Sequence, residues 1–283
     1  MERAEWSVAV RRSRFMMASL GLGLAALTAG CESFSQDLND FTTGLLPPSP
    51  TEAVAMAVDQ DADKRRRGTL LLANSPFGGN PPYLALYRDH VRNEPNPLVK
   101  AVSIRALAKH GAPDDATFIA PLLTHDNLQV RWEAAKGLQR LHQPRVIQPI
   151  IEGLLREDEH TDVRIALAGA LGQYPEDRVF QALVAVLDDR SLAVNVSASS
   201  SLTALTGVDH GLDSAAWYAW YNAATDPFAA QQDYLYPTYD RPESWLEQLA
   251  FWSHRVVEYP APPAGLEPQS QRRTYDDTDE TSP

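Results

Sequence analysis

Residues 130–138 read VRWEAAKGL, and this stretch decides the fold because three other stretches repeat its pattern. The copies are VKAVSIRAL at 99–107, VRIALAGAL at 163–171 and VNVSASSSL at 194–202, so successive copies start 31, 33 and 31 residues apart. Every copy begins with Val, has a small or apolar fifth residue and ends with Leu. These positions fall close to one face of an α-helix. The pattern predicts four amphipathic helices whose apolar stripes face the same way.

A second set of helices is predicted between these copies. Apolar residues at helical spacing occur in 52–58, 83–91, 114–123, 146–155 and 179–187, and a weaker copy, KRRRGTLLL, occupies 64–72. Acidic and amide residues separate the two sets, at 125–127, 157–159 and 188–189. They suit helix ends and N-caps because their side chains accept hydrogen bonds from free backbone N–H groups. Prolines, which cannot continue a helix, recur where one pair gives way to the next, at Pro113, Pro144 and Pro175.

A helix pair of this length, with Asp in its turn and Val-Arg at the start of its second helix, resembles the HEAT-repeat family. The resemblance covers residues 51–206, about five pairs, and is strongest over 95–206. It implies an all-α fold, a right-handed α-solenoid whose second helices line a concave side. One pair cannot bury its apolar stripe alone and must stack on its neighbours. Tetratricopeptide repeats have a similar length, but their Trp, Gly and Tyr signature is missing here.

The last copy and the residues after it indicate the end of the solenoid. Asn195 stands where the other copies have Lys or Arg, and four serines make this helix unusually polar, as expected of a repeat that meets water or a cap. Residues 207–225 predict a capping helix with Asp213 or Ser214 as its N-cap. Its aromatic residues also fit a ligand platform, but covering the open end is the better interpretation. These residues are Trp217, Tyr218, Trp220 and Tyr221.

Two segments follow the capping helix. Residues 226–259 form an aromatic-rich extension with a short candidate helix at 242–259, which either wraps back on the solenoid or contacts a partner. Residues 260–283 are rich in proline, glutamine and acidic residues, a composition that predicts a disordered acidic tail.

The N-terminus has the features of an export signal. Arg-Arg-Ser-Arg at 11–14 precedes 16 uncharged residues, 15–30, which are too few for a spanning helix and suit a signal peptide. The run Leu-Thr-Ala-Gly-Cys at 27–31 resembles the bacterial lipobox, which implies removal of residues 1–30 and acylation of Cys31. Residues 31–50 then predict a flexible tether, because they lack helical periodicity and end in a proline cluster. An uncleaved transmembrane anchor is the alternative. We expect a lipid-anchored protein on the exported side of the inner or outer bacterial membrane.

Charge and residue content argue against several functions. The net charge of −12 repels phosphate backbones, so we expect no nucleic-acid partner. The single cysteine permits neither an internal disulfide nor a Cys-rich zinc site. His110 and His142 fall at predicted helix C-termini, and His125 and His160 fall in turns, where capping or solvation explains them. We expect no metal, no cofactor and no catalytic residue, since no nucleophile, phosphate-binding or zinc motif occurs.

One helix carries a candidate binding surface. Trp132 lies off the apolar stripe of residues 130–138, and Arg131, Lys136 and Arg140 share its helix or follow it closely. Packing of Trp132 on a neighbouring repeat is the simpler interpretation, and an aromatic and basic patch for a partner is the other. Our hypothesis is a non-enzymatic scaffold or adaptor that binds a protein or peptide in the cell envelope. The alternative is a lyase-type or metal-dependent enzyme that uses acidic and His side chains, since some HEAT-like proteins resemble bilin lyases.

Overall fold

Two asparagines begin the helices that carry the first two aligned segments. The side-chain oxygen of Asn96 accepts hydrogen bonds from the N–H groups of Leu98 and Val99, and Asn127 does the same for the residues two and three positions after it. These bonds satisfy amides that have no partner inside the helix. The computed structural model describes residues 49–237 and 259–267, of which residue 52 onward belongs to one compact unit.

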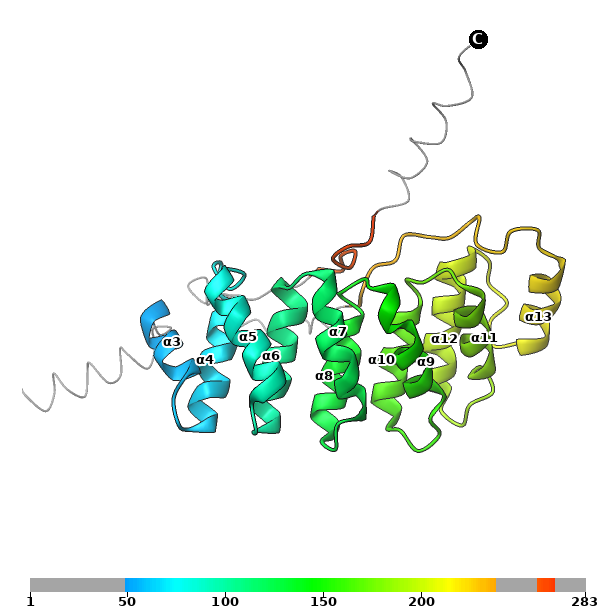
Figure 1. Ribbon diagram of the computed structural model, residues 1–283. Coiled ribbons are helices and arrows are strands. Elements are labelled where there is room, and N and C mark those ends of the chain that lie inside the picture. The colour runs from blue at the N-terminus through cyan, green and yellow to red at the C-terminus, as the bar shows by residue number, and fades with distance from the viewer. Residues whose placement is uncertain (1–48, 238–258, 268–283) are drawn as a thin grey trace, which may run out of the picture. The chain divides into compact units, whose positions relative to one another are not determined.

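Five helix pairs stack side by side in chain order (Figure 1). The first helices of the pairs are α3 (Pro50–Ala57), α5 (Pro81–Asn93), the run η1 (Pro113–Asp115), α7 (Ala116–Ile119) and η2 (Ala120–Thr124), then η3 (Pro144–Val146) with α9 (Ile147–Leu155), and α11 (Asp177–Ala185). The second helices are α4 (Ala62–Asn74), α6 (Pro97–His110), α8 (Leu128–Leu138), α10 (Thr161–Leu171) and α12 (Leu192–Thr206). The described residues contain helices and no strand, as predicted.

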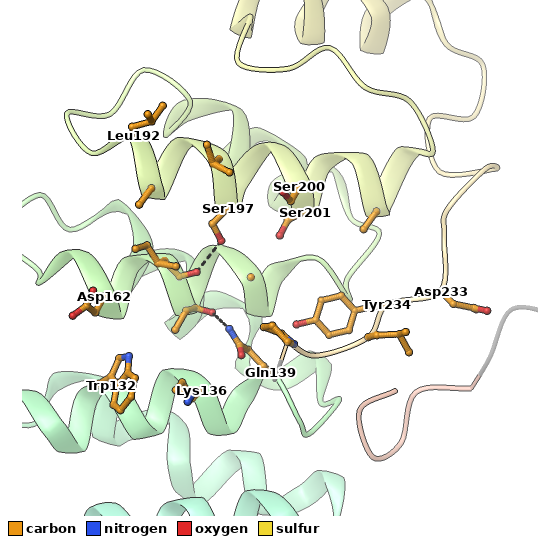
Figure 2. Close-up of a pocket in the computed structure, with 18 residues that line it drawn as sticks. Trp132, Lys136, Gln139, Asp162, Leu192, Ser197, Ser200, Ser201, Asp233 and Tyr234 are labelled. Atoms are coloured by element: carbon orange, nitrogen blue, oxygen red, sulfur yellow. Dashed lines mark hydrogen bonds between the residues drawn. The ribbon is translucent and has the colours of Figure 1, made fainter. Parts of the chain in front are cut away.

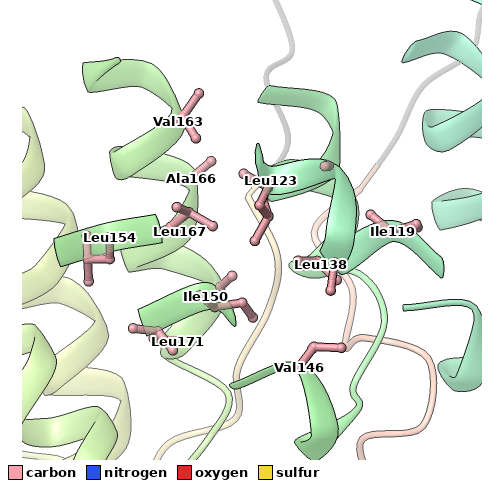
Figure 3. Close-up of a cluster of buried hydrophobic side chains, with 14 of the residues drawn as sticks. Ile119, Leu123, Leu138, Val146, Ile150, Leu154, Val163, Ala166, Leu167 and Leu171 are labelled. Carbon is pink, nitrogen blue, oxygen red and sulfur yellow. The ribbon is translucent and has the colours of Figure 1, made fainter. Parts of the chain in front are cut away.

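The aligned positions form the core. The Val that begins each segment and the Leu that ends it are fully buried, at Val99, Val130, Val163, Val194, Leu107, Leu138, Leu171 and Leu202. Figure 3 shows Leu138, Leu167 and Leu171 packed with side chains of the first helices, such as Ile150. Burying each Leu stabilises the fold by about 1.5–3 kcal/mol, so the repeated stripe contributes substantially to stability.

The basic residue at the second position of these segments has a structural role. Arg131 donates to the carbonyls of His125 and Asp126 in the turn before its own helix, and it forms an ion pair with Glu159 in the next turn. Arg65–Glu94 and Arg164–Asp189 repeat this arrangement. In the last pair, Asn195 donates to the carbonyl of Asp189 and is buried. The residue that differs from the other copies therefore still ties its helix to the preceding turn.

Two of the four serines of α12 pack on α10, whereas Ser199 donates to the loop before the capping helix and Ser200 is exposed, as expected of a repeat that meets a cap or water. Ser197 donates to the carbonyl of Ile165 at 3.0 Å, and Ser201 donates to that of Ala168 at 2.8 Å. These serines allow the two helices to pack closely, because each hydroxyl donates a hydrogen bond to a backbone carbonyl of the neighbouring helix.

The predicted capping helix is present as α13 (Ser214–Ala223), with Asp213 as its N-cap. Trp217 is fully buried and lies edge-on to Phe180 of α11, while Tyr221 stacks on the same ring at 4.1 Å between ring centres. This helix covers the last pair, as an end cap must.

Part of the predicted disordered tail is ordered. Residues 231–237 and 259–267, which we call the strap, lie along the solenoid. The N–H of Ala264 donates to Arg140, and its carbonyl accepts from His142. Composition alone predicted disorder after residue 259, but the free backbone edge that follows α8 pairs with the strap. Cys31, the signal, most of the tether and nearly all of the candidate helix at 242–259 lie outside the described residues.

Candidate functional site

A groove runs over α10, and we call it the α10 groove. Its volume is about 1280 Å³, and α8, α10, α12 and the strap line it (Figure 2). The residues from α8 and its end are Trp132, Lys136 and Gln139, and those from α10 are Asp162, Ile165, Ala166 and Gly169. The opposite wall consists of Leu192, Ala193, Val196, Ser197, Ser200, Ser201 and Ala204 of α12, and the strap adds Asp233, Tyr234, Leu235 and Pro237.

The walls of the groove expose large apolar side chains. Leu192 is 64% exposed, and Val196 and Leu235 are each 50% exposed. Small residues, Ala166 and Gly169, lie between the walls. Burying three aliphatic side chains is favourable, so this surface gains free energy when it is covered.

The floor of the groove is closely packed. Gln139 donates to the carbonyl of Ala166 at 2.8 Å. A Cβ on Gly169 would lie 2.9 Å from the Gln139 amide nitrogen, so a glycine lets that amide cross onto α10.

Trp132 and Lys136 lie together in the groove. Trp132 packs against the core, and the ammonium nitrogen of Lys136 lies 4.6 Å from the centre of its ring. Trp132 therefore packs on its neighbours, as the simpler interpretation predicted, and it also lines the groove. A cation held over an indole face is stabilised electrostatically, which keeps Lys136 at this wall.

The other two residues of the candidate surface lie elsewhere. The Arg131 guanidinium is directed to Glu159 and two carbonyls, so it holds neighbouring repeats together. The Arg140 guanidinium lies 4.7 Å from the centre of the Tyr236 ring, beneath the strap. Neither lines the groove. The structure brings together two of the four residues that we selected from the sequence.

Sequence reasoning missed the apolar wall, although a signal for it exists. Trp132, Ile165 and Val196 all stand two positions after the Val that begins their aligned segment. All three line the groove. The strap had no such signal, because its place depends on contacts between residues far apart in the chain.

The ends of the groove carry acidic residues. Asp162 lies at one end, beside the N-terminus of α10, and Asp233 lies at the other (Figure 2). The Asp162 side chain is 66% exposed. The strap also places Tyr234 at the wall, and its buried hydroxyl has no hydrogen-bond partner among the described residues. Burial raises the pKa of this phenol, and nearby Tyr174 adds to the effect, so Tyr234 stays neutral.

The histidines act within the fold. His125 and His160 each accept a backbone N–H from the residue two positions ahead, which is the predicted capping role. His110 lies 2.6 Å from the carbonyl oxygen of Ala73, and His142 lies 3.1 Å from the Gln173 side-chain oxygen. Over residues 49–237 and 259–267, no three His, Cys, Asp or Glu side chains are grouped closely enough to hold a metal ion. In the same part of the chain, no helix has the length and apolar character needed to cross a membrane.

Two family models match the repeats. The HEAT-repeat model matches residues 84–156, and the model of the PBS lyase HEAT-like repeat matches residues 163–189. The chain is a HEAT-repeat protein. The second match includes Ile165, Ala166 and Gly169 of the α10 groove. No curated protein matches this HEAT-repeat protein.

Solved structures show distant likenesses to this HEAT-repeat protein. The crystal structure of an engineered protein is 18% identical, with a TM-score of 0.44, and the match covers 54% of this chain and 78% of that one. The complex of CpcE and CpcF of phycocyanin lyase from Nostoc sp. PCC7120 is also 18% identical. That match has a TM-score of 0.37 and covers 56% of this chain and 77% of the other.

Proposed function

We propose that this HEAT-repeat protein is a non-enzymatic scaffold that binds a protein or peptide partner in the α10 groove. The observation that carries the proposal is the apolar wall, where Leu192, Val196 and Leu235 are half or more exposed around one groove. Large apolar side chains grouped in a concave site are typical of binding surfaces. Trp132 adds an aromatic residue of the kind that dominates binding energy.

The test is capture from detergent-solubilised membranes with the full chain and two variants. Val196→Glu places a charge in the groove, and Gln181→Glu adds the same charge to an exposed position on α11, outside the groove. We expect wild type and Gln181→Glu to recover a partner in near-stoichiometric amounts and Val196→Glu to lose it. Recovery of the same proteins by all three chains would show that the groove is not the binding site.

We further propose that an acylated Cys31 holds the scaffold on the exported side of the bacterial envelope. The support is the sequence of residues 11–31, a basic segment, a short apolar run and a cysteine after Ala-Gly. Membrane fractionation and intact mass of wild type beside Cys31→Ala test it. We expect wild type to sediment with membranes at the mass of an acylated chain that begins at Cys31, and the variant to lose both properties. Identical behaviour would reject the anchor.

A lyase-related activity is the second candidate, because a PBS lyase HEAT-like repeat matches the part of the chain that contributes α10 to the groove. In this alternative the groove holds a chromophore, or acidic and His side chains bind a metal ion with residues outside 49–237 and 259–267, since the described residues bring no three such side chains together. Absorbance spectra and elemental analysis of the purified full chain test it. A visible chromophore or a stoichiometric metal, lost in Val196→Glu and kept in Gln181→Glu, would favour the lyase over the scaffold.

A further inference from the structure

We propose that the occupant of the α10 groove is an amphipathic α-helix of about three turns with basic residues at both ends, an inference that rests on the function proposed above. It follows from the backbone groups that line the groove, its dimensions and the charges at its ends.

The backbone of α10 has few free hydrogen-bond acceptors for an extended peptide that lies along it. The carbonyls of Ile165, Ala166 and Ala168 already accept side-chain hydrogen bonds besides belonging to α10. An extended chain buried here would leave its own N–H and C=O groups without partners, which costs about 1–3 kcal/mol for each group. A helix satisfies its backbone internally and needs only side-chain contacts.

The strap illustrates this constraint. Its residues 231–237 are not helical, and Gln232 donates its N–H to the carbonyl of Ala204 in the last turn of α12. Carbonyls of a last helical turn lack partners within the helix, so an extended segment can bond there. Tyr236 then pairs with Ala261 of the second part of the strap. Along α10, by contrast, the carbonyls of Ile165, Ala166 and Ala168 are already occupied.

The length of the groove suits a short helix, because an occupant that lies along α10 is matched to the length of that helix. The 11 residues of α10 span about 16 Å, or three turns.

The acidic residues at the ends of the groove favour an occupant with basic residues at its own ends. Asp162 and Asp233 lie at opposite ends of the groove, as Figure 2 shows, and the whole chain carries −12. A helix with Lys or Arg in its first and last turns meets a carboxylate at each end and is drawn in by the net charge. Between the ends, its apolar stripe covers Leu192 and Val196.

The experiment measures fluorescence anisotropy of three labelled 14-residue peptides against the full chain. The first has leucines at helical spacing and two lysines at each end, the second has glutamates in place of the lysines, and the third is the first with two central prolines. We expect the lysine peptide to bind at least about fivefold more tightly than the glutamate peptide, because two exposed charge pairs are reversed. Proline should abolish binding, because it breaks the helix.

Variants of the chain complete the test. Asp162→Lys combined with Asp233→Lys should reverse the order of the lysine and glutamate peptides, and Asp162→Lys alone should bring their affinities together. Val196→Glu should weaken the lysine peptide, and Gln181→Glu should leave it unchanged. Circular dichroism confirms that each variant is folded.

Three results would overturn the proposal: equal binding of the lysine and glutamate peptides, equal binding of the proline peptide, or no saturable binding of any peptide. Failure of the proposed function is a different result, namely a captured partner that is indifferent to Val196→Glu. A captured partner that requires Val196, combined with any of the three results, keeps the function and rejects the cationic helix.

Discussion

Arg131 and Glu159 face each other across the boundary between the third and fourth helix pairs, with the Arg131 Nε 3.0 Å from each carboxylate oxygen of Glu159. The Glu159 side chain is 1% exposed and the Arg131 side chain is 19% exposed. Glu159 also accepts the N–H of His160 and lies near Arg156. One buried side chain therefore joins the turn of one pair to the second helix of the pair before it.

Glu159→Gln should lower the free energy of unfolding by about 2–4 kcal/mol, because it leaves the enclosed guanidinium of Arg131 without its counter-charge. Urea unfolding followed by circular dichroism measures this. The matched control is Asp63→Asn, which breaks an ion pair with Arg66 whose carboxylate is 86% exposed, and it should change stability by less than about 0.5 kcal/mol. Equal effects of the two substitutions would contradict a structural role for Glu159.

Glu94 should make stability depend on pH. Burial raises its pKa, but hydrogen bonds from Arg65 and the N–H of Asn96 outweigh this, and the net pKa lies below the ordinary value of 4.5. A carboxyl whose pKa is lowered on folding contributes stability that is complete above 4.5 and is lost as the pH falls through its folded pKa. Glu94→Gln should therefore be less stable than wild type at pH 7, with the gap narrowing below pH 4.5. Urea midpoints from pH 7 to 3 measure the gap, and a constant gap would refute the prediction.

Tyr234→Phe should keep or raise stability, by up to about 1 kcal/mol, because the hydroxyl it removes is buried and has no partner among the described residues. Tyr174→Phe is the control. The Tyr174 hydroxyl contacts both the N–H and the carbonyl of Gln143, and its loss should destabilise by about 1 kcal/mol. The midpoint of thermal unfolding should be unchanged or higher in Tyr234→Phe and lower in Tyr174→Phe, and a destabilised Tyr234→Phe would show that its hydroxyl has a partner.

Gly265→Val should detach the second part of the strap. Gly265 has a φ of +88°, which disfavours other residues, and a Cβ there would lie 2.4 Å from the Cγ of Pro113. Hydrogen exchange should report faster exchange at the N–H groups of Ala264 and His142, which bond across this contact. Gly211→Val, at a φ of +57° with no atom within 4 Å of the added Cβ, tests backbone strain alone. Unchanged exchange at both amides in Gly265→Val would contradict the prediction.

The repeat pattern predicted the helix pairs because the burial of each aligned Val and Leu depends only on its own helix and on the equivalent helix of the next pair. Arg131 was selected from the sequence as a candidate binding residue, and its contact with Glu159 was not foreseen because that partner is 28 residues away. The recurring combination of a basic residue after Val and an acidic residue in the next turn, also present in Arg164 and Asp189, is the signal that identifies such pairs.

The strap was beyond prediction for a different reason. Proline and glycine at 260–265 suggest disorder when only composition is considered. Pro263 is nevertheless buried, and Ala264 finds the free backbone that follows α8. Neither the acceptor nor the shape of that site can be read from the residues of the strap.

In an ordinary solenoid each repeat touches only its neighbours, so bending is distributed over all the interfaces between repeats. Here the strap bonds to Ala204 of the fifth pair and to Arg140, just after the second helix of the third pair, and Tyr236 joins its two parts to each other. These hydrogen bonds connect the fifth pair to the third pair through the strap, across the fourth. We therefore expect the first pairs to bend more than the last three, and the α10 groove to change its width less than the rest of the solenoid changes its curvature.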